Sequence, residues 1–377
     1  MATLIRLPIT NAILGGGYTG AVALGGRPPV QVIVDTGSST LAVDGAHFDP
    51  AAATATRTTN LAQAVSYGAG GWIGAVVQTA VGLTDVTLVD AHLTVTYGES
   101  TGMFGAAQGI LGLAYAPLDS AHVVPGDAWA AKFPPAEVQA SPTVELAPYF
   151  TQLEVAGVVK NKFALAVRRA STRLATADPA TDPANQGVLV LGGGEEATDL
   201  YRGDFTVVEV IHDVWYNTRL VEVQVGDQPP IAVAPLPPGD PLQSNSIVDS
   251  GTSALLFTPP LYQAILAAFH AVDPAFDGLL TAHAAGGPGL AHAALDLARW
   301  PPLALRFQAH AGTATVAIAP DAYWQLDAAG PGLALAYLAS GQAGRSILGL
   351  PLFAGRYVVF DRSRDGGVGE IRFAALA

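Results

Sequence analysis

The chain has 377 residues, of which 50% are hydrophobic and 13% are charged, and this length suffices for two or three domains. Its net charge of −13 argues against nucleic acid as a partner, and the absence of cysteine excludes disulfides, thiol chemistry and cysteine-ligated metals. No apolar run approaches the roughly 20 residues that span a membrane. The 42 Gly and 27 Pro residues favour a β protein rich in turns.

The first part of the chain is a series of predicted β hairpins. Residues 18–24 alternate in polarity, the Gly- and Pro-rich segment 25–29 turns the chain, and residues 30–35 return as a second strand. A second hairpin is expected over residues 61–81, with three glycines and two aromatic residues at its tip, residues 67–72. Because hairpin tips usually carry polar residues, this tip is either a lid over a site or a packed turn.

The middle of the chain has weaker patterns. Residues 117–142 are rich in Pro and Ala and are predicted to be a long loop, and residues 146–156 are a candidate helix. Residues 174–186 contain two Asp-Pro pairs, which are typical of an interdomain linker. Since a strand pattern resumes at residue 188, the loop of a hairpin is an equal alternative.

The last part contains one clear helix and a closing hairpin. Thr258 precedes two prolines and an apolar pattern that continues to residue 269, which predicts a helix capped by Thr258. Residues 282–294 are expected to form a loop. Residues 357–361 and 369–373 are expected to pair as strands.

Two motifs each occur twice. The sequence VIVDTGSS at residues 32–39 matches SIVDSGTS at residues 246–253, and GILGL at residues 109–113 matches SILGL at residues 346–350. In the first pair, an apolar strand delivers an Asp, Asp35 or Asp249, into a turn of Gly and hydroxyl residues. Two motifs in the same order in both halves predict an internal duplication of a β domain, with the two carboxylates in one site.

Other patterns lack the context that their chemistry requires. GxGxxG at residues 15–20 and GxSxG at residues 98–102 must each lead into a helix, but a β pattern follows the first and a Gly-rich loop follows the second. The eight histidines have no metal-binding spacing, so no metal is expected.

Paired carboxylates suit hydrolysis. A buried carboxylate needs hydrogen-bond donors, which the neighbouring hydroxyls and the Gly amides can supply. Two Asp side chains within hydrogen-bonding distance raise the pKa of one of them and share a proton. One can then act as general base on a water while the other acts as general acid toward a carbonyl, without a metal or cofactor. A glycosidase also uses two carboxylates, but these are spaced to admit a sugar.

Two further motifs are YGAG at residues 67–70 and FDR at residues 360–362. Together with the repeated motifs, they make the chain resemble the pepsin-like aspartic peptidases over nearly its full length. The resemblance implies a mainly β, bilobal fold with a pseudo-dyad and a cleft between an N-terminal lobe (1–200) and a C-terminal lobe (201–377). It implies that Asp35 and Asp249 are the catalytic pair. The other implied site residues are Ser38 and Thr252 for the outer carboxylate oxygens, Tyr67, Gly68 and Ala69 for a flap over the substrate, and Gly37 and Gly251 for positioning the peptide.

The implied function is an aspartic endopeptidase that cleaves peptides or unfolded proteins between bulky hydrophobic residues, is inhibited by statine-type compounds and needs no cofactor. The isoelectric point near 4.9 fits activity in acid. A monomer is expected, because one chain carries both Asp motifs and a retroviral-type homodimer is unnecessary. The alternative is an inactive pepsin-like binding module. Such relatives usually lose an Asp or its motif, and both are intact here.

The chain departs from many relatives around the flap and in its processing. Ala42 stands where a flap-bracing Trp is common, and Trp72 is a candidate for a different brace. The usual disulfides are absent, and neither a signal nor an inhibitory prosegment is expected, because a strand pattern starts close to Met1. The chain resembles the cysteine-free bacterial homologues in these respects. We expect a cytoplasmic location, with the periplasm or secretion after signal removal as the alternative.

Overall fold

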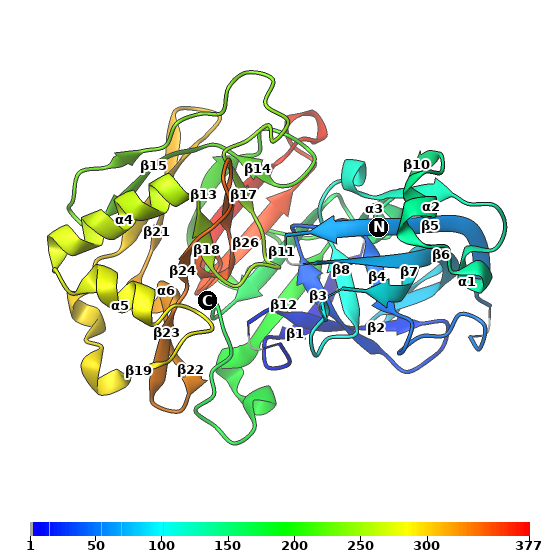
Figure 1. Ribbon diagram of the computed structural model, residues 1–377, viewed down its shortest axis with the longest axis horizontal. Helices are drawn as coiled ribbons and strands as arrows, with labels where there is room; N and C mark the ends of the chain where they lie inside the picture. Colours follow the sequence, from blue (N-terminus) through cyan, green and yellow to red (C-terminus); the bar gives the residue numbers. More distant parts are fainter. Residues whose placement is uncertain (1–2, 15, 54, 69, 101) are drawn as a thin grey trace.

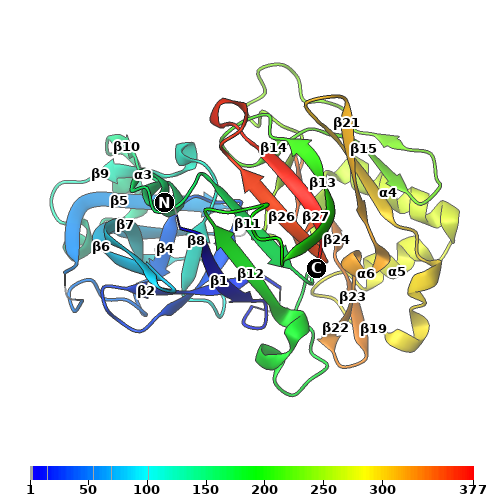
Figure 2. The same ribbon diagram turned by 180° about the vertical axis from the view of Figure 1, so that it is seen from behind.

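The computed structural model describes residues 3–14, 16–53, 55–68, 70–100 and 102–377. Strands predominate in it, which confirms the mainly β fold that the sequence predicts. Figure 1 and Figure 2 show two lobes side by side, one containing the blue and cyan strands and the other the yellow and orange elements. No helix in the described part of the chain is long and apolar enough to cross a membrane.

The largest sheet has 15 strands and runs through both lobes. Its order is β10 (Thr143–Glu145), β9 (Ser120–Val123), β5 (Arg57–Tyr67), β6 (Gly70–Leu83), β7 (Val86–Glu99), β4 (Leu41–Asp44), β8 (Gly109–Gly112), β3 (Val30–Asp35), β2 (Thr19–Leu24), β1 (Ile5–Thr10), β12 (Gln186–Leu191), β11 (Lys162–Val167), β26 (Arg356–Asp361), β27 (Glu370–Leu376) and β13 (Tyr201–Glu209). Strand β11 pairs antiparallel with β26, so hydrogen bonds join the two halves of the chain; these strands lie centrally in Figure 2. The predicted lobe boundary at residue 200 falls between β12 and β13 and stays a prediction.

Three smaller sheets complete the second half. They contain β14 (Asn217–Thr218), β17 (Ser246–Val248), β25 (Ser346–Leu348), β18 (Leu255–Phe257) and β24 (Leu338–Ser340); β16 (Ile231–Ala232), β15 (Leu220–Val225), β20 (Leu303–Gln308) and β21 (Thr313–Ile318); and β19 (Leu290–Ala291), β23 (Leu333–Ala336) and β22 (Trp324–Gly330). The α-helices are α1 (Ala128–Ala131), α2 (Pro135–Gln139), α3 (Tyr149–Val155), α4 (Pro259–Val272), α5 (Phe276–Ala282) and α6 (Pro320–Tyr323). Short 3₁₀ helices are η1 (Ala116–Leu118), η2 (Pro179–Thr181), η3 (Pro183–Asn185), η4 (His292–Ala294), η5 (Leu297–Arg299), η6 (Leu350–Leu352) and η7 (Asp365–Gly367). Helix α4 packs against β15 (Figure 1).

The strands around the two Asp motifs have the same connectivity, which confirms the predicted duplication. In the first half β3 pairs parallel with β8, β8 antiparallel with β4, and β4 parallel with β7. In the second half β17, β25, β18 and β24 repeat this pattern. The glycine of each Ile-Leu-Gly motif lies against the backbone of the Asp loop: a Cβ on Gly112 would lie 2.6 Å from Ser39 N, and one on Gly349 would lie 2.8 Å from Thr252 C. A larger residue would push the Asp loop away from its strand.

Several local predictions agree with the structure. The hairpins over 18–35 and 61–81 form, as do helices α3 and α4 and the closing hairpin β26–β27. The run 174–186 is the loop of a hairpin, because β11 and β12 pair antiparallel on either side of it. Gly15 and Thr101, within the two rejected motifs, lie outside the described residues. Strand β2 follows the first of these motifs, and turns and then β8 follow the second, as expected.

Three local expectations were wrong. The predicted loop 117–142 contains β9, α1 and α2, because the Asp127 side chain accepts hydrogen bonds from the first backbone N–H groups of α1 and Pro135 begins α2. Thr258 precedes α4 but its side chain makes no capping hydrogen bond. The predicted loop 282–294 begins at the end of the unpredicted helix α5 and contains β19 and η4.

An aromatic cluster and one arginine join the halves in the core. The rings of Phe163 on β11 and Phe360 on β26 stack with centroids 4.9 Å apart, and Tyr216 packs edge-on against Phe360 at 4.4 Å. Arg362 is buried, donates to the Tyr216 hydroxyl at 2.7 Å, and donates to the backbone oxygen of Ala114, just after β8. This packing holds the loop after β8 beside the second half of the chain.

Candidate active site

Asp35, the last residue of β3, is buried, and each of its carboxylate oxygens accepts a hydrogen bond from the following turn. The backbone N–H of Gly37 donates to Asp35 Oδ1 at 2.7 Å, and the Ser38 hydroxyl donates to Asp35 Oδ2 at 2.5 Å. These donors come from the turn that directly follows the strand. The sequence Asp-Thr-Gly-Ser therefore builds both the carboxylate and its hydrogen-bond partners into one loop.

Asp249, directly after β17, is held in the same way. The Gly251 N–H donates to Asp249 Oδ1 at 2.8 Å, and the Thr252 hydroxyl donates to Asp249 Oδ2 at 2.7 Å. Asp249 is 9% exposed and Asp35 is 6% exposed, so both carboxylates are shielded but reachable. The repeated sequence thus produces two equivalent carboxylate loops.

Each loop glycine contacts the carboxylate of the other loop. A Cβ on Gly37 would lie 2.6 Å from Asp249 Cγ, and a Cβ on Gly251 would lie 2.7 Å from Asp35 Cγ. Contacts this short do not occur for real Cβ atoms, so only glycine allows the two loops to approach to this distance. These glycines therefore allow the close approach of the carboxylate pair, in addition to lining the cleft.

The pKa of Asp35 is raised well above its ordinary value. Burial is the largest cause, followed by the charge of Asp249 and a side-chain hydrogen bond with Asp249. The Ser38 hydroxyl and the Gly37 N–H act in the opposite direction. The Asp35 carboxyl group therefore keeps its proton in a range where an isolated Asp is ionised.

Thr36 and Ser250 were not predicted as site residues, yet they connect the two loops. The Thr36 hydroxyl donates to the Val248 backbone oxygen at 3.0 Å and accepts from the Ser250 N–H at 2.9 Å. The Ser250 hydroxyl donates to the Val34 backbone oxygen at 2.8 Å and accepts from the Thr36 N–H at 3.0 Å. Both copies of the motif have a hydroxyl residue directly after the Asp, and this repetition could have predicted that Thr36 and Ser250 belong to the site.

A cleft of about 780 Å³ opens above the pair. Apolar side chains from both halves predominate in its walls, which include Ile33, Ile110, Phe104, Met103, Trp215, Ile247, Leu256 and Ile347. The rest of its lining consists of glycines and of polar or ionisable residues: Gly37, Gly68, Gly102, Gly251, Asp35, Ser66, Tyr67, Asp249, Thr252, Gln342 and Arg345. All the predicted site residues except Ser38 and Ala69 are among these residues. Ser38 lies beneath the pair, bonded to Asp35, and Ala69 lies outside the described residues.

The tip of the β5–β6 hairpin forms one wall of this cleft. Tyr67 is half-buried there, and burial and the nearby Asp35 raise its pKa, while the Trp72 indole and the Ser38 hydroxyl act to lower it. Trp72 is buried in an apolar cluster with Ala42, against which Tyr67 packs. The Trp72 ring from the hairpin therefore occupies space beside the small Ala42 side chain.

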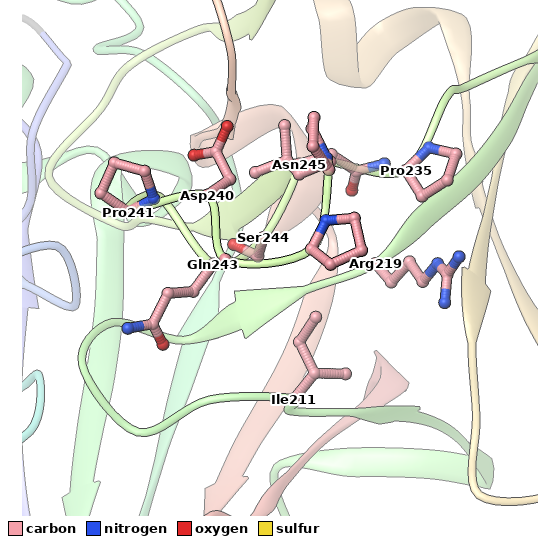
Figure 3. A pocket seen from close by; sticks show the side chains of 12 residues that line it. Ile211, Arg219, Pro235, Asp240, Pro241, Gln243, Ser244 and Asn245 are labelled. Atoms are coloured by element: carbon pink, nitrogen blue, oxygen red, sulfur yellow. The ribbon is translucent and has the colours of Figure 1, made fainter.

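Two other places have potential ligands but lie outside the cleft lining. In the described residues, the ligand atoms of Glu209, His310 and Asp365 lie within 4.8 Å of one another, but His310 Nε2 is already 3.2 Å from Glu370. A hollow of about 720 Å³ is lined by the Pro-rich loop before β17 (Figure 3). Its buried side chains Ser244 and Asn245 are hydrogen-bonded within the protein. We assign no chemistry to either place.

The chain is similar to known proteins over most of its length. The profile of the family described as "Eukaryotic aspartyl protease" matches residues 17–129 and 177–375. Cathepsin D of Chionodraco hamatus is 27% identical over 259 residues, which cover 63% of this chain and 54% of that protein. The match thus spans about half the length of this curated relative. Both Asp loops fall within the matched residues of the family profile.

Proposed function

Because the chain belongs to the family of the eukaryotic aspartyl proteases, we propose that it is an aspartic endopeptidase with Asp35 and Asp249 as its catalytic pair. The observation that carries this proposal is the symmetric pair of buried carboxylates at the base of the cleft. Each carboxylate accepts a hydrogen bond from a glycine N–H on one oxygen and from a side-chain hydroxyl on the other. The family likeness alone would not distinguish an active enzyme from a binding protein.

The shared proton defines the proposed steps. The ionised carboxyl group takes a proton from a water held between the pair, and that water attacks the peptide carbonyl carbon. The protonated carboxyl group donates to the carbonyl oxygen, which gives a tetrahedral diol. The carboxyl group that took the proton from water then donates it to the amide nitrogen, while the other carboxylate takes a proton from one diol hydroxyl. The C–N bond breaks, an amine and a carboxylic acid leave, and the pair returns to its starting protonation. The hydrogen bonds from Ser38 and Thr252 keep both carboxyl groups oriented through these transfers.

The cleft supports an extended peptide with bulky apolar residues beside the scissile bond. Its walls contain Phe104, Ile110 and Met103 on one side and Ile247, Ile347 and Trp215 on the other. Gly68 is exposed at the hairpin tip and lines the cleft, which supports a role for its backbone in binding the substrate. Tyr67, in the same lining, would close over the substrate. Statine-type compounds, which imitate the diol, are expected to inhibit. Activity in mild acid follows from the need for one proton on the pair.

The test is cleavage of a denatured protein between about pH 3 and 7, a range that begins near the ordinary Asp pKa and extends above it. Asp35→Asn and Asp249→Asn are each expected to lose almost all turnover, because neither amide can exchange the proton. Asp204→Asn, at an exposed position of β13, is the matched control and should cleave like the wild type. Full activity in either site variant would refute the mechanism.

An inactive binding module is the second candidate. In that case the wild type would cleave none of a varied set of peptides, yet bind some of them in the cleft. Calorimetric titration of those peptides with the wild type distinguishes the two candidates.

A further inference from the structure

A buried arginine lies in the wall of the cleft without a carboxylate partner among the described residues. Arg345 directly precedes β25, is 7% exposed, and lines the same cavity as the two carboxylates. Its Nε and Nη1 atoms are shielded from solvent and have no hydrogen-bond acceptor in the described residues. The same residues include no carboxylate at ion-pairing distance from it. An uncompensated buried guanidinium is rare, because each of its N–H donors loses water on burial.

The surroundings stabilise this charge only in part. The guanidinium lies over the Trp215 ring, with Cζ 4.1 Å from the ring centroid. Asp249 favours the charged form through its field, but burial is the larger effect and lowers the pKa of Arg345. An arginine nevertheless stays protonated throughout the pH range of proteins. The ionisable side chains that line the cleft with it are Asp35, Asp249 and Tyr67.

Folding stability does not account for an arginine at this position. An apolar residue of similar size would avoid the desolvation of an unpaired charge. The feature does suit a ligand, because a guanidinium pairs with a carboxylate through two parallel N–H···O bonds. The methylene groups of an acidic side chain would meanwhile lie in a cavity whose lining includes Ile247 and Ile347.

We propose that Arg345 and Trp215, with Ile247 and Ile347, form a subsite for an acidic side chain of the peptide substrate, on the Asp249 side of the cleft. This inference rests on the proposed peptidase function and refines it. One substrate position takes Glu or Asp, while the remaining walls take apolar residues. The acidic side chain supplies a directly paired carboxylate, which the described residues do not provide to Arg345.

The test compares matched peptides that differ only by Glu or Gln at one position, scanned across the residues on both sides of the scissile bond. At about pH 6, where free Glu is ionised, one position is expected to favour Glu in kcat/KM by about 10- to 100-fold, the range of a charge-assisted hydrogen bond. Below about pH 4 the preference should disappear, because the Glu side chain then becomes protonated.

Arg345→Met is expected to remove the preference, so that the Glu and Gln peptides at that position are cleaved with equal kcat/KM. Its Tm should equal or exceed that of the wild type, since an unpaired buried charge is removed. Arg345→Lys, which keeps the charge but loses the planar fork, should retain part of the preference. Arg202→Gln, at an exposed position of β13, is the control and should change neither peptide.

Equal kcat/KM for Glu and Gln at every position would overturn the subsite. If Arg345→Met lowers kcat/KM by the same factor for the Glu and Gln peptides, the subsite is also overturned. That result would assign Arg345 to the positioning of Asp249. Failure of the peptidase function is seen separately, as no cleavage of any peptide. In that case the Kd values of the same peptides for wild type and Arg345→Met still decide whether the acidic side chain is recognised.

Discussion

Thr36 and Ser250 make the same two hydrogen bonds to each other's loop, in opposite directions. Each hydroxyl accepts a hydrogen bond from the backbone N–H of the other residue. Each also donates to a backbone oxygen in the strand that leads into the other Asp loop. All the groups involved are buried. The separation of the two carboxylates is therefore set by the loops themselves, beneath the cleft.

Thr36→Val tests this connection with a side chain of almost the same shape. The Val248 oxygen and the Ser250 N–H would lose a partner, at about 1–3 kcal/mol for each buried group left unpaired. Urea unfolding is expected to show this loss of stability, and kcat should fall because the pair is no longer held. Thr315→Val, at an exposed position of β21, is the control. Wild-type stability in Thr36→Val would mean that packing alone joins the loops.

The raised pKa of Asp35 predicts how stability depends on pH. Native Asp35 keeps its proton in a range where the unfolded chain has released it, so the unfolded state binds fewer protons there. The free energy of unfolding therefore falls as pH rises above about 3.9, the ordinary Asp value. Asp35→Asn removes this titration. Its Tm should exceed that of the wild type at about pH 7 by a margin that shrinks toward about pH 3.

Calorimetry across this pH range measures the margin. Asp119, whose pKa burial also raises, is present in both proteins and cancels from the difference. The exposed variant Asp204→Asn should show no such margin. A margin independent of pH would mean that the pKa of Asp35 is the same in the native and unfolded states.

Gly251→Ala should damage turnover more than folding. The added Cβ would lie 2.7 Å from Asp35 Cγ, so the carboxyl group must move. We expect a fall in kcat of about 100-fold from this displacement, with about 1–3 kcal/mol of overpacking. The control is Gly278→Ala in α5, where no atom lies within 4 Å and alanine should stabilise the helix by about 0.5–1 kcal/mol. Unchanged kcat in Gly251→Ala would show that the loops can separate without loss of function.

Tyr67 and Trp72 should respond differently to truncation. Tyr67 lines the cleft and is half-buried, so Tyr67→Ala is expected to lower kcat/KM by about 10- to 100-fold with little change in Tm. Trp72 is buried in the cluster with Ala42, so Trp72→Ala is expected to lower the free energy of unfolding by about 3–5 kcal/mol. A large loss of Tm with normal turnover in Tyr67→Ala would make Tyr67 a packing residue instead.

The sequence predicted the parts of the fold and site that repeat or alternate. The duplicated frames around Asp35 and Asp249 located both carboxylate loops, and alternation located the hairpins. The helices in 117–142 were not predicted, because Ala and Pro carry no periodicity and the cap at Asp127 is a single residue. Arg345 could not be predicted either. Its proposed role in the subsite depends on contact with Trp215, which is 130 positions away in the sequence and is brought close only by the fold.

The pairing of β11 with β26 also affects how the protein is made. All six residues of β11 are buried in the finished molecule, yet its partner on one side ends at Asp361. During synthesis on the ribosome, the first half therefore emerges with one apolar strand edge unpaired until β26 has also left the exit tunnel. Such an edge invites association with other nascent chains. Productive folding of the first half therefore waits for strands β26 and β27, which complete its sheet.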